Sequence, residues 1–268
     1  MTTNQKEAPL VLVTGGGSGI GRALCRNLHQ RGYSLLVVSL LQAELDSLKE
    51  ELVNGPPVET LALDITTEGA AAKILAFAKS LERFVEILIN NAGVGLFGNH
   101  IDLPEERVAL MLKLNVLALT EITSLFGREM AERGHGKILN VASTASFQPL
   151  PRMAAYAASK SYVASFSAAL AEELGPRGVQ VSVFYPGTTR TPFLESAGVN
   201  DAKGLVGTIA KWAAMEPDTA AEIALRGFFA NEQEIVPGPL NMGHFLTTRL
   251  LPKRLATKVF DVIGQRRG

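Results

Sequence analysis

The strongest constraint on the fold is the regular alternation of short apolar runs with longer segments of helical periodicity. Six short runs consist mainly of β-branched or aliphatic residues, and we interpret them as strands: residues 10–13, 35–38, 58–63, 87–89, 137–141 and 179–184. Such strands are typical of a parallel sheet that has helices on both faces. Residues 234–236 form a weaker seventh candidate. The alternation predicts an α/β fold, a doubly wound and mostly parallel sheet of about seven strands flanked by helices.

The helical segments between these runs have recognisable ends. They cover residues 42–52, a long stretch from Pro104 towards Met130, and residues 156–174, which stop at Gly175-Pro176. The chain shows no internal repeat and no change of composition that would mark a linker. We therefore expect one domain over residues 1–268, with a substrate lid at about 188–215 and a helical tail at about 240–268.

Charge and composition argue against several classes of function. Lys plus Arg and Asp plus Glu both number 26 and are interspersed, so we expect no nucleic-acid partner. The four histidines lack metal-ligand spacing, and we expect no metal site. Residues 1–9 have no apolar signal region, and no apolar run approaches the ~18 residues that cross a bilayer. These features favour a soluble cytoplasmic protein.

A glycine-rich turn, Thr14-Gly15-Gly16-Gly17-Ser18-Gly19-Ile20-Gly21, follows the first strand and leads into a helix. Glycine lets the backbone turn sharply and approach a phosphate, and a helix N-terminus attracts that anion. An ordinary strand-to-helix turn is the alternative interpretation. The spacing is Gly-x-x-x-Gly-x-Gly, which differs from the commonest dinucleotide-binding pattern.

A tyrosine and a lysine four residues apart form the second motif, Tyr156-Ala157-Ala158-Ser159-Lys160. This spacing places both side chains on one helix face, and Ser143 follows the preceding strand. A phenol can act as an acid or base if a nearby cation lowers its pKa from about 10. The alternative is a surface or packing pair.

Taken together, these motifs resemble those of the short-chain dehydrogenase/reductase family, in its shorter single-domain subgroup. Asn90-Asn91-Ala92-Gly93 and Pro186-Gly187 also match segments of that family. The resemblance implies a Rossmann-type domain and an NAD(P)-dependent oxidoreductase. Such an enzyme transfers a hydride reversibly between the nicotinamide and a ketone or aldehyde, or a secondary alcohol, with Tyr156 as the general acid/base.

The resemblance also assigns roles to individual residues. It implies that Ser143 positions the carbonyl oxygen, that Lys160 binds the nicotinamide ribose, that Asn115 holds a water in a proton relay, and that Asp64 contacts the adenine. The implied catalytic residues are Asn115, Ser143, Tyr156 and Lys160. The implied cofactor-binding residues are Gly15, Gly17, Ser18, Gly19, Ile20, Gly21, Ser39, Asp64, Asn91, Ala92, Gly93, Tyr156, Lys160, Pro186, Gly187, Thr188 and Thr191.

The end of the second strand reads the 2′ position of the cofactor. Ser39 stands where NAD-preferring family members carry Asp, and Leu40 stands where many NADP-preferring members carry Arg. Because no carboxylate there would repel a phosphate, the sequence slightly favours NADP(H) over NAD(H).

Apolar residues after the strands predict a hydrophobic substrate pocket. They are Ala145, Phe147, Leu150, Met153 and Phe193, with residues 94–97 as a second wall. Core packing is the alternative at each position.

The tail beyond residue 245 is basic and amphipathic, so it could touch an anionic membrane. Packing on its own domain or across a subunit interface is the favoured interpretation. The resemblance implies a homodimer or homotetramer formed through the helices near 104–133 and 151–174. Two other functions remain open: a catalytically silent, cofactor-sensing binding protein of the same fold, and an epimerase or dehydratase.

Overall fold

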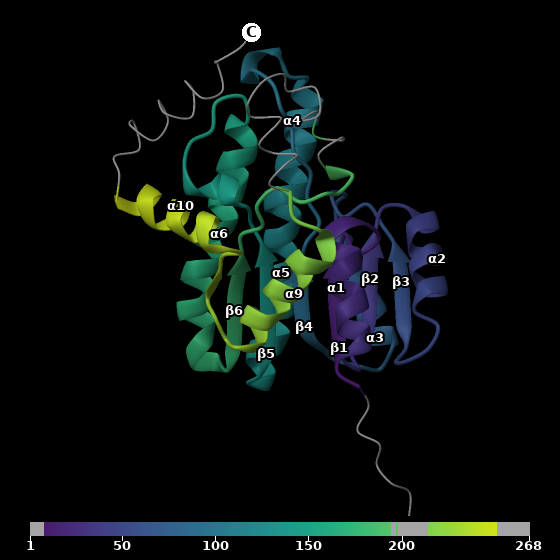
Figure 1. Ribbon diagram of the computed structural model, residues 1–268. Helices are drawn as coiled ribbons and strands as arrows, with labels where there is room; N and C mark the ends of the chain where they lie inside the picture. The colour runs from purple at the N-terminus through teal and green to yellow at the C-terminus, as the bar shows by residue number, and fades with distance from the viewer. Residues whose placement is uncertain (1–7, 194–196, 198–213, 251–268) are drawn as a thin grey trace, which may run out of the picture.

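The computed structural model describes residues 8–193, 197 and 214–250. These residues build one seven-stranded sheet (Figure 1) with the strand order β3-β2-β1-β4-β5-β6-β7. The strands are β1 Leu10–Thr14, β2 Ser34–Ser39, β3 Val58–Ala62, β4 Val85–Asn90, β5 Gly136–Val141, β6 Val179–Phe184 and β7 Glu234–Ile235. Every neighbouring pair is parallel. The predicted fold class is therefore confirmed, and the sheet is parallel throughout.

Helices cover both faces of the sheet (Figure 1). They are α1 Gly19–Gln30, α2 Gln42–Glu51, α3 Ala70–Ser80, α4 Glu105–Leu112, α5 Leu119–Arg133, α6 Ala154–Leu174, α9 Pro217–Phe229 and α10 Pro239–Leu250. One apolar core joins α1, α2 and α9 to alternate strand residues such as Val11 and Val37. The other core joins α3, α5 and α6 to the intervening residues, such as Leu12 and Val38. This alternation explains why the strands are apolar on both faces.

The strand order reverses beside β1. From β1 the chain runs outward through β2 to β3, and β4 then returns to the other side of β1. Ligands of such sheets bind beyond the carboxyl ends of the strands at this reversal. The glycine-rich turn after β1 and the segment after β4 meet at this point.

The long helical stretch predicted from Pro104 is not one regular α-helix. A π-helical turn, Lys113–Ala118, separates α4 from α5 and contains the buried Asn115. By length and composition the stretch Glu105–Arg133 also qualifies as a candidate membrane span. It meets that test although the sequence contains no uninterrupted apolar run of that length, and it packs on the sheet through Ile122, Phe126 and Met130. Packing against the sheet accounts for part of its apolar composition, and Leu110 and Leu117 of the same stretch are exposed.

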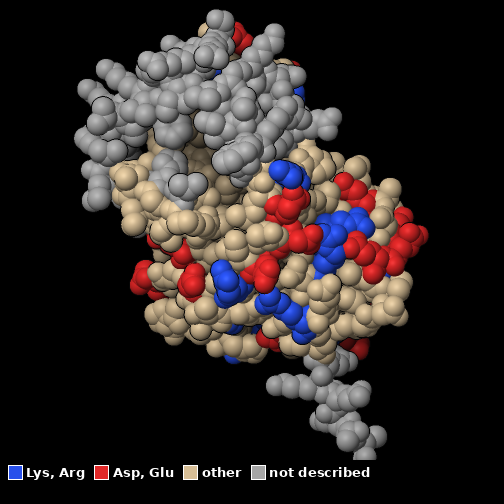
Figure 2. Space-filling view, in the orientation of Figure 1, with Lys and Arg blue, Asp and Glu red and all other residues tan. Residues whose placement is uncertain are grey.

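Charges of both signs are interspersed over the face formed by α1, α2 and α9 (Figure 2). There Arg22 and Arg26 pair with Glu51, and Arg26 also pairs with Asp218. Partly exposed pairs of this kind contribute only about 0–1 kcal/mol each. This face carries no large patch of a single sign that would attract a polyanion.

Two predicted segments lie largely outside the described residues. Of the lid expected at 188–215, the structure describes residues 188–193, 197, 214 and 215. Of the tail expected at 240–268, it describes the part that belongs to α10.

Candidate active site

The glycine-rich turn joins β1 to α1 in a conformation that requires glycine. Gly15 has a φ of +64°, and a Cβ there would lie 2.8 Å from Ala92 Cα. A Cβ on Gly21 would overlap the carbonyl oxygen of Gly15. The N-cap of α1 is Ser18, whose side chain makes no capping hydrogen bond. The first turn of α1 can therefore offer its N–H groups and its positive dipole end to an anion such as a pyrophosphate.

The segment after β4 is tied to this turn. The backbone N–H groups of Asn91 and Ala92 donate to Thr14 Oγ1, both at 3.2 Å, and Asn91 Nδ2 donates to Gly15 O at 2.9 Å. The structure thus brings together the turn residues and Asn91, Ala92 and Gly93, which the sequence assigned to one cofactor cleft. The side chain of Asn91 holds the two backbone segments together.

Helix α6 places Tyr156 and Lys160 one turn apart, and both side chains are buried. Ser143 follows β5 and makes a side-chain hydrogen bond with Tyr156. Ser143 Oγ also accepts from Ala145 N at 3.1 Å, which leaves its hydroxyl proton to be donated. The structure therefore brings together the serine, the tyrosine and the lysine that the sequence placed in one site.

Burial controls the proton affinities of these side chains. It raises the pKa of Tyr156 to about 12, and the hydrogen bond with Ser143 opposes that change. It lowers the pKa of Lys160 to about 8, because a buried ammonium loses its hydration. The Lys160 ammonium donates to Val141 O at 2.9 Å. The sequence argument expected nearby cations to lower the tyrosine pKa, whereas in this structure desolvation outweighs every other influence on it.

Asn115 projects from the π-helical turn onto the backbone that follows β4. Its Oδ1 accepts from Val94 N at 3.0 Å, and its Nδ2 donates to Val94 O at 2.9 Å and to Ser159 Oγ at 3.1 Å. A Cβ on Gly93 would lie 3.1 Å from Asn115 Oδ1 and 3.2 Å from Lys160 Nζ. Asn115 and Lys160 therefore flank the same glycine. The π-turn directs Asn115 to this place, a use typical of such turns at functional sites.

An apolar cluster surrounds the phenol of Tyr156. Its members are Val94, Leu96, Leu103, Val108, Met111, Ala145, Met153, Ala155, Tyr156 and Phe193. The Phe193 ring lies 5.6 Å from the Tyr156 ring between centroids, and a Cβ on Gly95 would lie 2.7 Å from Phe193 Cζ. Ala145, Met153 and Phe193, which the sequence analysis assigned to a substrate pocket, thus lie beside the candidate catalytic tyrosine.

The two other predicted pocket residues, Phe147 and Leu150, are not members of this apolar cluster. The Phe147 ring packs against Tyr185 and Phe245, with centroid distances of 5.2 and 4.9 Å, in a separate aromatic cluster that includes α10. Leu150 is half-buried in the loop before α6. Nothing in the local sequence distinguishes Phe147 from Phe193, because the rings that contact Phe147, those of Tyr185 and Phe245, come from distant parts of the chain.

The remaining predicted cofactor residues lie at carboxyl ends of strands or close to the glycine turn. Ser39 ends β2. Asp64 follows β3 and is exposed, and its carboxylate accepts from Thr66 N at 2.9 Å. Pro186, Gly187 and Thr188 follow β6, and a Cβ on Gly19 would lie 3.1 Å from Thr191 Cγ2. Thr191 therefore reaches back to the turn between β1 and α1. Ile20 packs on the core beneath α1.

Three residues of the site escaped the sequence analysis. Ser159 bonds Asn115 and donates to Tyr156 O at 2.7 Å, Met111 borders Tyr156, and Glu44 lies beside Ser39. Ser159 lies inside the Tyr-to-Lys spacing, which was a usable signal. Met111 resembles any core residue, and Glu44 resembles any solvated helix residue.

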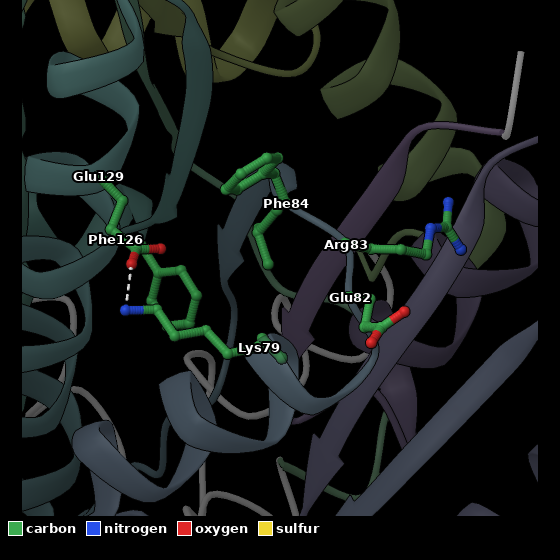
Figure 3. A pocket seen from close by; sticks show the side chains of 8 residues that line it. Lys79, Glu82, Arg83, Phe84, Phe126 and Glu129 are labelled. Atoms are coloured by element: carbon green, nitrogen blue, oxygen red, sulfur yellow. Dashed lines mark ion pairs between the residues drawn. The ribbon is translucent and has the colours of Figure 1, made fainter.

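A cavity lies at the opposite end of the sheet (Figure 3). It is lined by Ala78, Lys79, Glu82, Arg83, Phe84, Val85, Phe126 and Glu129. Lys79 and Glu129 form an ion pair of 2.8 Å in its wall. Because Val85 begins β4, this cavity lies at the amino ends of the strands, away from the place where ligands of such sheets bind. Among the residues that the structure describes, no group of three His, Cys, Asp or Glu could hold a metal ion.

The model of the short chain dehydrogenase family matches residues 9–201. The chain belongs to this family of NAD(P)-dependent oxidoreductases. It is 34% identical over 200 residues to the NAD-dependent glycerol dehydrogenase of Listeria innocua, covering 74% of this chain and 76% of that protein.

Two solved structures show the same fold. The short-chain dehydrogenase of Sphingobium yanoikuyae in complex with NADPH has a TM-score of 0.78 and 30% identity, over 97% of this chain and 96% of that one. The 3-ketoacyl-(acyl-carrier-protein) reductase of Brucella melitensis complexed with NADH has a TM-score of 0.73 and 29% identity, over 85% and 93% of the two chains. The neighbours thus include both an NADPH complex and an NADH complex.

Proposed function

We propose that the protein reduces a hydrophobic ketone or aldehyde to the alcohol, with Tyr156 as the proton donor, and catalyses the reverse oxidation under alkaline conditions. The observation that carries the proposal is the environment of Tyr156. Its phenol is buried, is hydrogen-bonded to Ser143 and is surrounded by apolar side chains. A phenol with a pKa of about 12 stays protonated near neutral pH, as an acid for reduction requires.

Tyr156, Ser143 and Lys160 would each have a separate role in the reaction. A bound reduced nicotinamide supplies the hydride for the carbonyl carbon. Tyr156 gives its proton to the carbonyl oxygen as negative charge develops there. Ser143 donates a hydrogen bond to the same oxygen, a contribution that grows with the charge. Lys160 holds a positive charge below a pH of about 8, close to where the nicotinamide ribose would lie, and that charge favours the phenolate formed in the transfer.

The chain offers a continuous surface for the dinucleotide. The turn from Gly15 to Gly21 would take the pyrophosphate, and residues 91–93 would line the cleft beside it. Pro186, Gly187, Thr188 and Thr191 would lie along the nicotinamide. Asn115 holds the backbone of Val94 in place, which fixes the floor of the cleft between Gly93 and Lys160.

The apolar character of the cluster around Tyr156 sets the class of substrate. A carbonyl compound with aliphatic or aromatic substituents would bury them against Leu96, Met111 and Phe193. A polyol or sugar would leave its hydroxyl groups without partners there, at a cost of about 1–3 kcal/mol for each buried group. We therefore expect hydrophobic carbonyl compounds to react faster than polar compounds of equal size.

To test the proposal, the protein is incubated with NADH or NADPH in which the hydrogen to be transferred is deuterium. The substrates are hydrophobic and polar ketones and aldehydes of matched size. We expect loss of reduced-nicotinamide absorbance and one deuterium on the carbinol carbon of the product. Tyr156→Phe is the control and is expected to bind the cofactor without turnover. Tight cofactor binding with no deuterium transfer to any compound would favour the cofactor-sensing function instead.

We also propose that the chain forms a homo-oligomer through the long helices. Leu110 on α4, Leu117 in the π-turn and Tyr162 on α6 are exposed, and α4 and α6 contact each other. Exposed apolar side chains on contacting helices are compatible with a subunit interface. Sedimentation analysis tests this proposal, and a monomer at micromolar concentration would contradict it. The cytoplasmic location and the packing of the tail stay predictions.

A further inference from the structure

The carboxylate of Glu44 lies at the carboxyl end of β2, although Glu44 belongs to α2. Its Oε2 accepts a hydrogen bond from Ser39 Oγ at 3.2 Å. A Cβ on Gly17 would lie 2.5 Å from Glu44 Oε2 and 2.9 Å from Ser39 Oγ. The Glu44 carboxylate therefore occupies the space between the glycine turn and the last residue of β2. The side chain is half-buried, which limits solvent screening of its charge.

The arginine that reaches the glycine turn is committed to other groups. Arg22 of α1 donates Nε to Glu51 at 2.8 Å, Nη2 to Ser47 Oγ at 3.0 Å and Nη1 to Gly17 O at 3.3 Å. Among the described residues, Glu44 itself takes part in no ion pair within 4.0 Å. Leu40, the residue after β2, is exposed and carries no charge. The local charge that faces the space is therefore negative.

In sheets of this kind the end of the second strand reads the 2′ position of the adenosine ribose. A carboxylate accepts a hydrogen bond from a 2′-hydroxyl, and it repels a 2′-phosphate that no cation neutralises. We propose that Glu44 is the residue that determines cofactor preference and that it makes the protein favour NAD(H) over NADP(H). This inference rests on the proposed function, because it concerns the cofactor of the same site.

The inference reverses the preference expected from the sequence. That expectation depended on the lack of a carboxylate at Ser39 and Leu40. Helix α2 supplies the carboxylate from a position five residues after Ser39, and Ser39 orients it by hydrogen bonding. Ser39 thus acts with Glu44 rather than as a donor to a phosphate.

The test compares the dissociation constants of NADH and NADPH, measured by nicotinamide fluorescence, for the wild type, Glu44→Gln and Glu50→Gln. Glu50 is an exposed carboxylate of the same helix, so Glu50→Gln removes the same charge without altering the space beside Ser39. We expect the wild type to bind NADH at least about tenfold more tightly than NADPH. Glu44→Gln should reduce this ratio by about tenfold, mainly through tighter NADPH binding.

The remaining outcomes separate this inference from the proposed function. Glu50→Gln should leave the ratio within about twofold of the wild type, because exposed charges contribute little. A wild type that prefers NADPH, or a Glu44→Gln ratio equal to that of the wild type, would overturn the role of Glu44 and leave the oxidoreductase proposal intact. Failure of the wild type to bind either nucleotide would overturn both.

Discussion

Replacing Lys160 with Met should raise the free energy of unfolding near neutral pH. This gain over the wild type should become smaller as the pH rises. Lys160 is almost fully buried, and burial lowers its pKa from 10.5 to about 8. One pKa unit corresponds to about 1.4 kcal/mol, so keeping this ammonium charged inside the fold costs about 3 kcal/mol near pH 7. The variant avoids this cost, but it leaves Val141 O without its hydrogen-bond donor. The unpaired carbonyl reduces the gain in stability by about 1–3 kcal/mol.

The pH dependence separates these two contributions. Because the folded pKa is lowered, the unfolded chain binds more protons than the folded chain between about pH 8 and 10.5. The buried charge therefore destabilises the folded protein by its maximum amount below about pH 8, and this destabilisation declines as the pH rises above 8. The loss of the Val141 hydrogen bond has no such dependence. The free energy of unfolding of the wild type, relative to the variant, should rise by about 2 kcal/mol between about pH 7 and pH 9.5.

Urea unfolding of both proteins at several pH values and one protein concentration measures this difference. Lys73→Met is the matched control, because Lys73 is an exposed lysine of α3. A difference between wild type and Lys160→Met that stays constant over this pH range would show that Lys160 is hydrated in the folded protein. The account of its charge would then be wrong.

Three further predictions concern the walls of the site. Gly21→Ala should prevent folding or lower the melting temperature by several degrees, because the added Cβ would overlap Gly15 O; an unchanged melting temperature would contradict the description of the turn. Asn115→Ala should destabilise the protein by about 2–4 kcal/mol in urea unfolding, because Val94 N–H and C=O lose their partners. A loss below about 0.5 kcal/mol would show that these bonds are not needed. Phe193→Ala should raise KM for hydrophobic ketones by about tenfold and leave the Kd of the cofactor unchanged, and an unchanged KM would remove Phe193 from the pocket.

The sheet could be predicted from the sequence because its signals are local. Residues 179–184 alternate valines with Gln180 and Ser182 and end at Phe184, and the structure contains a strand with those bounds. The edge strand β3 is only partly buried, because no strand pairs with its outer side and its sequence includes Glu59 and Thr60. The π-turn at Lys113–Ala118 was not predictable, since it interrupts a helical pattern without changing the kind of residue that appears there.

The candidate site likewise contains features that local sequence predicts and features that depend on tertiary packing. Tyr156 and Lys160 are four residues apart on one helix, so their proximity followed from the sequence. The carboxylate beside Ser39 did not, because it depends on how α2 is rotated against the end of β2. The pKa of Tyr156 also depends on burial by side chains from several elements, such as Met111 and Phe193. Local pattern therefore identified the reacting groups, and tertiary packing sets their environment.

The turnover and cofactor affinity of Tyr156→Phe test the central claim most directly. The substitution removes one buried hydroxyl and keeps the ring that packs against Phe193. With a hydrophobic ketone that the wild type reduces, we expect kcat to fall at least about 100-fold. The Kd of the cofactor should stay within about twofold, because loss of the hydroxyl and of its hydrogen bond with Ser143 leaves the glycine turn and residues 91–93 unchanged. A variant that keeps more than about a tenth of the wild-type turnover would contradict the assignment of Tyr156 as the proton donor.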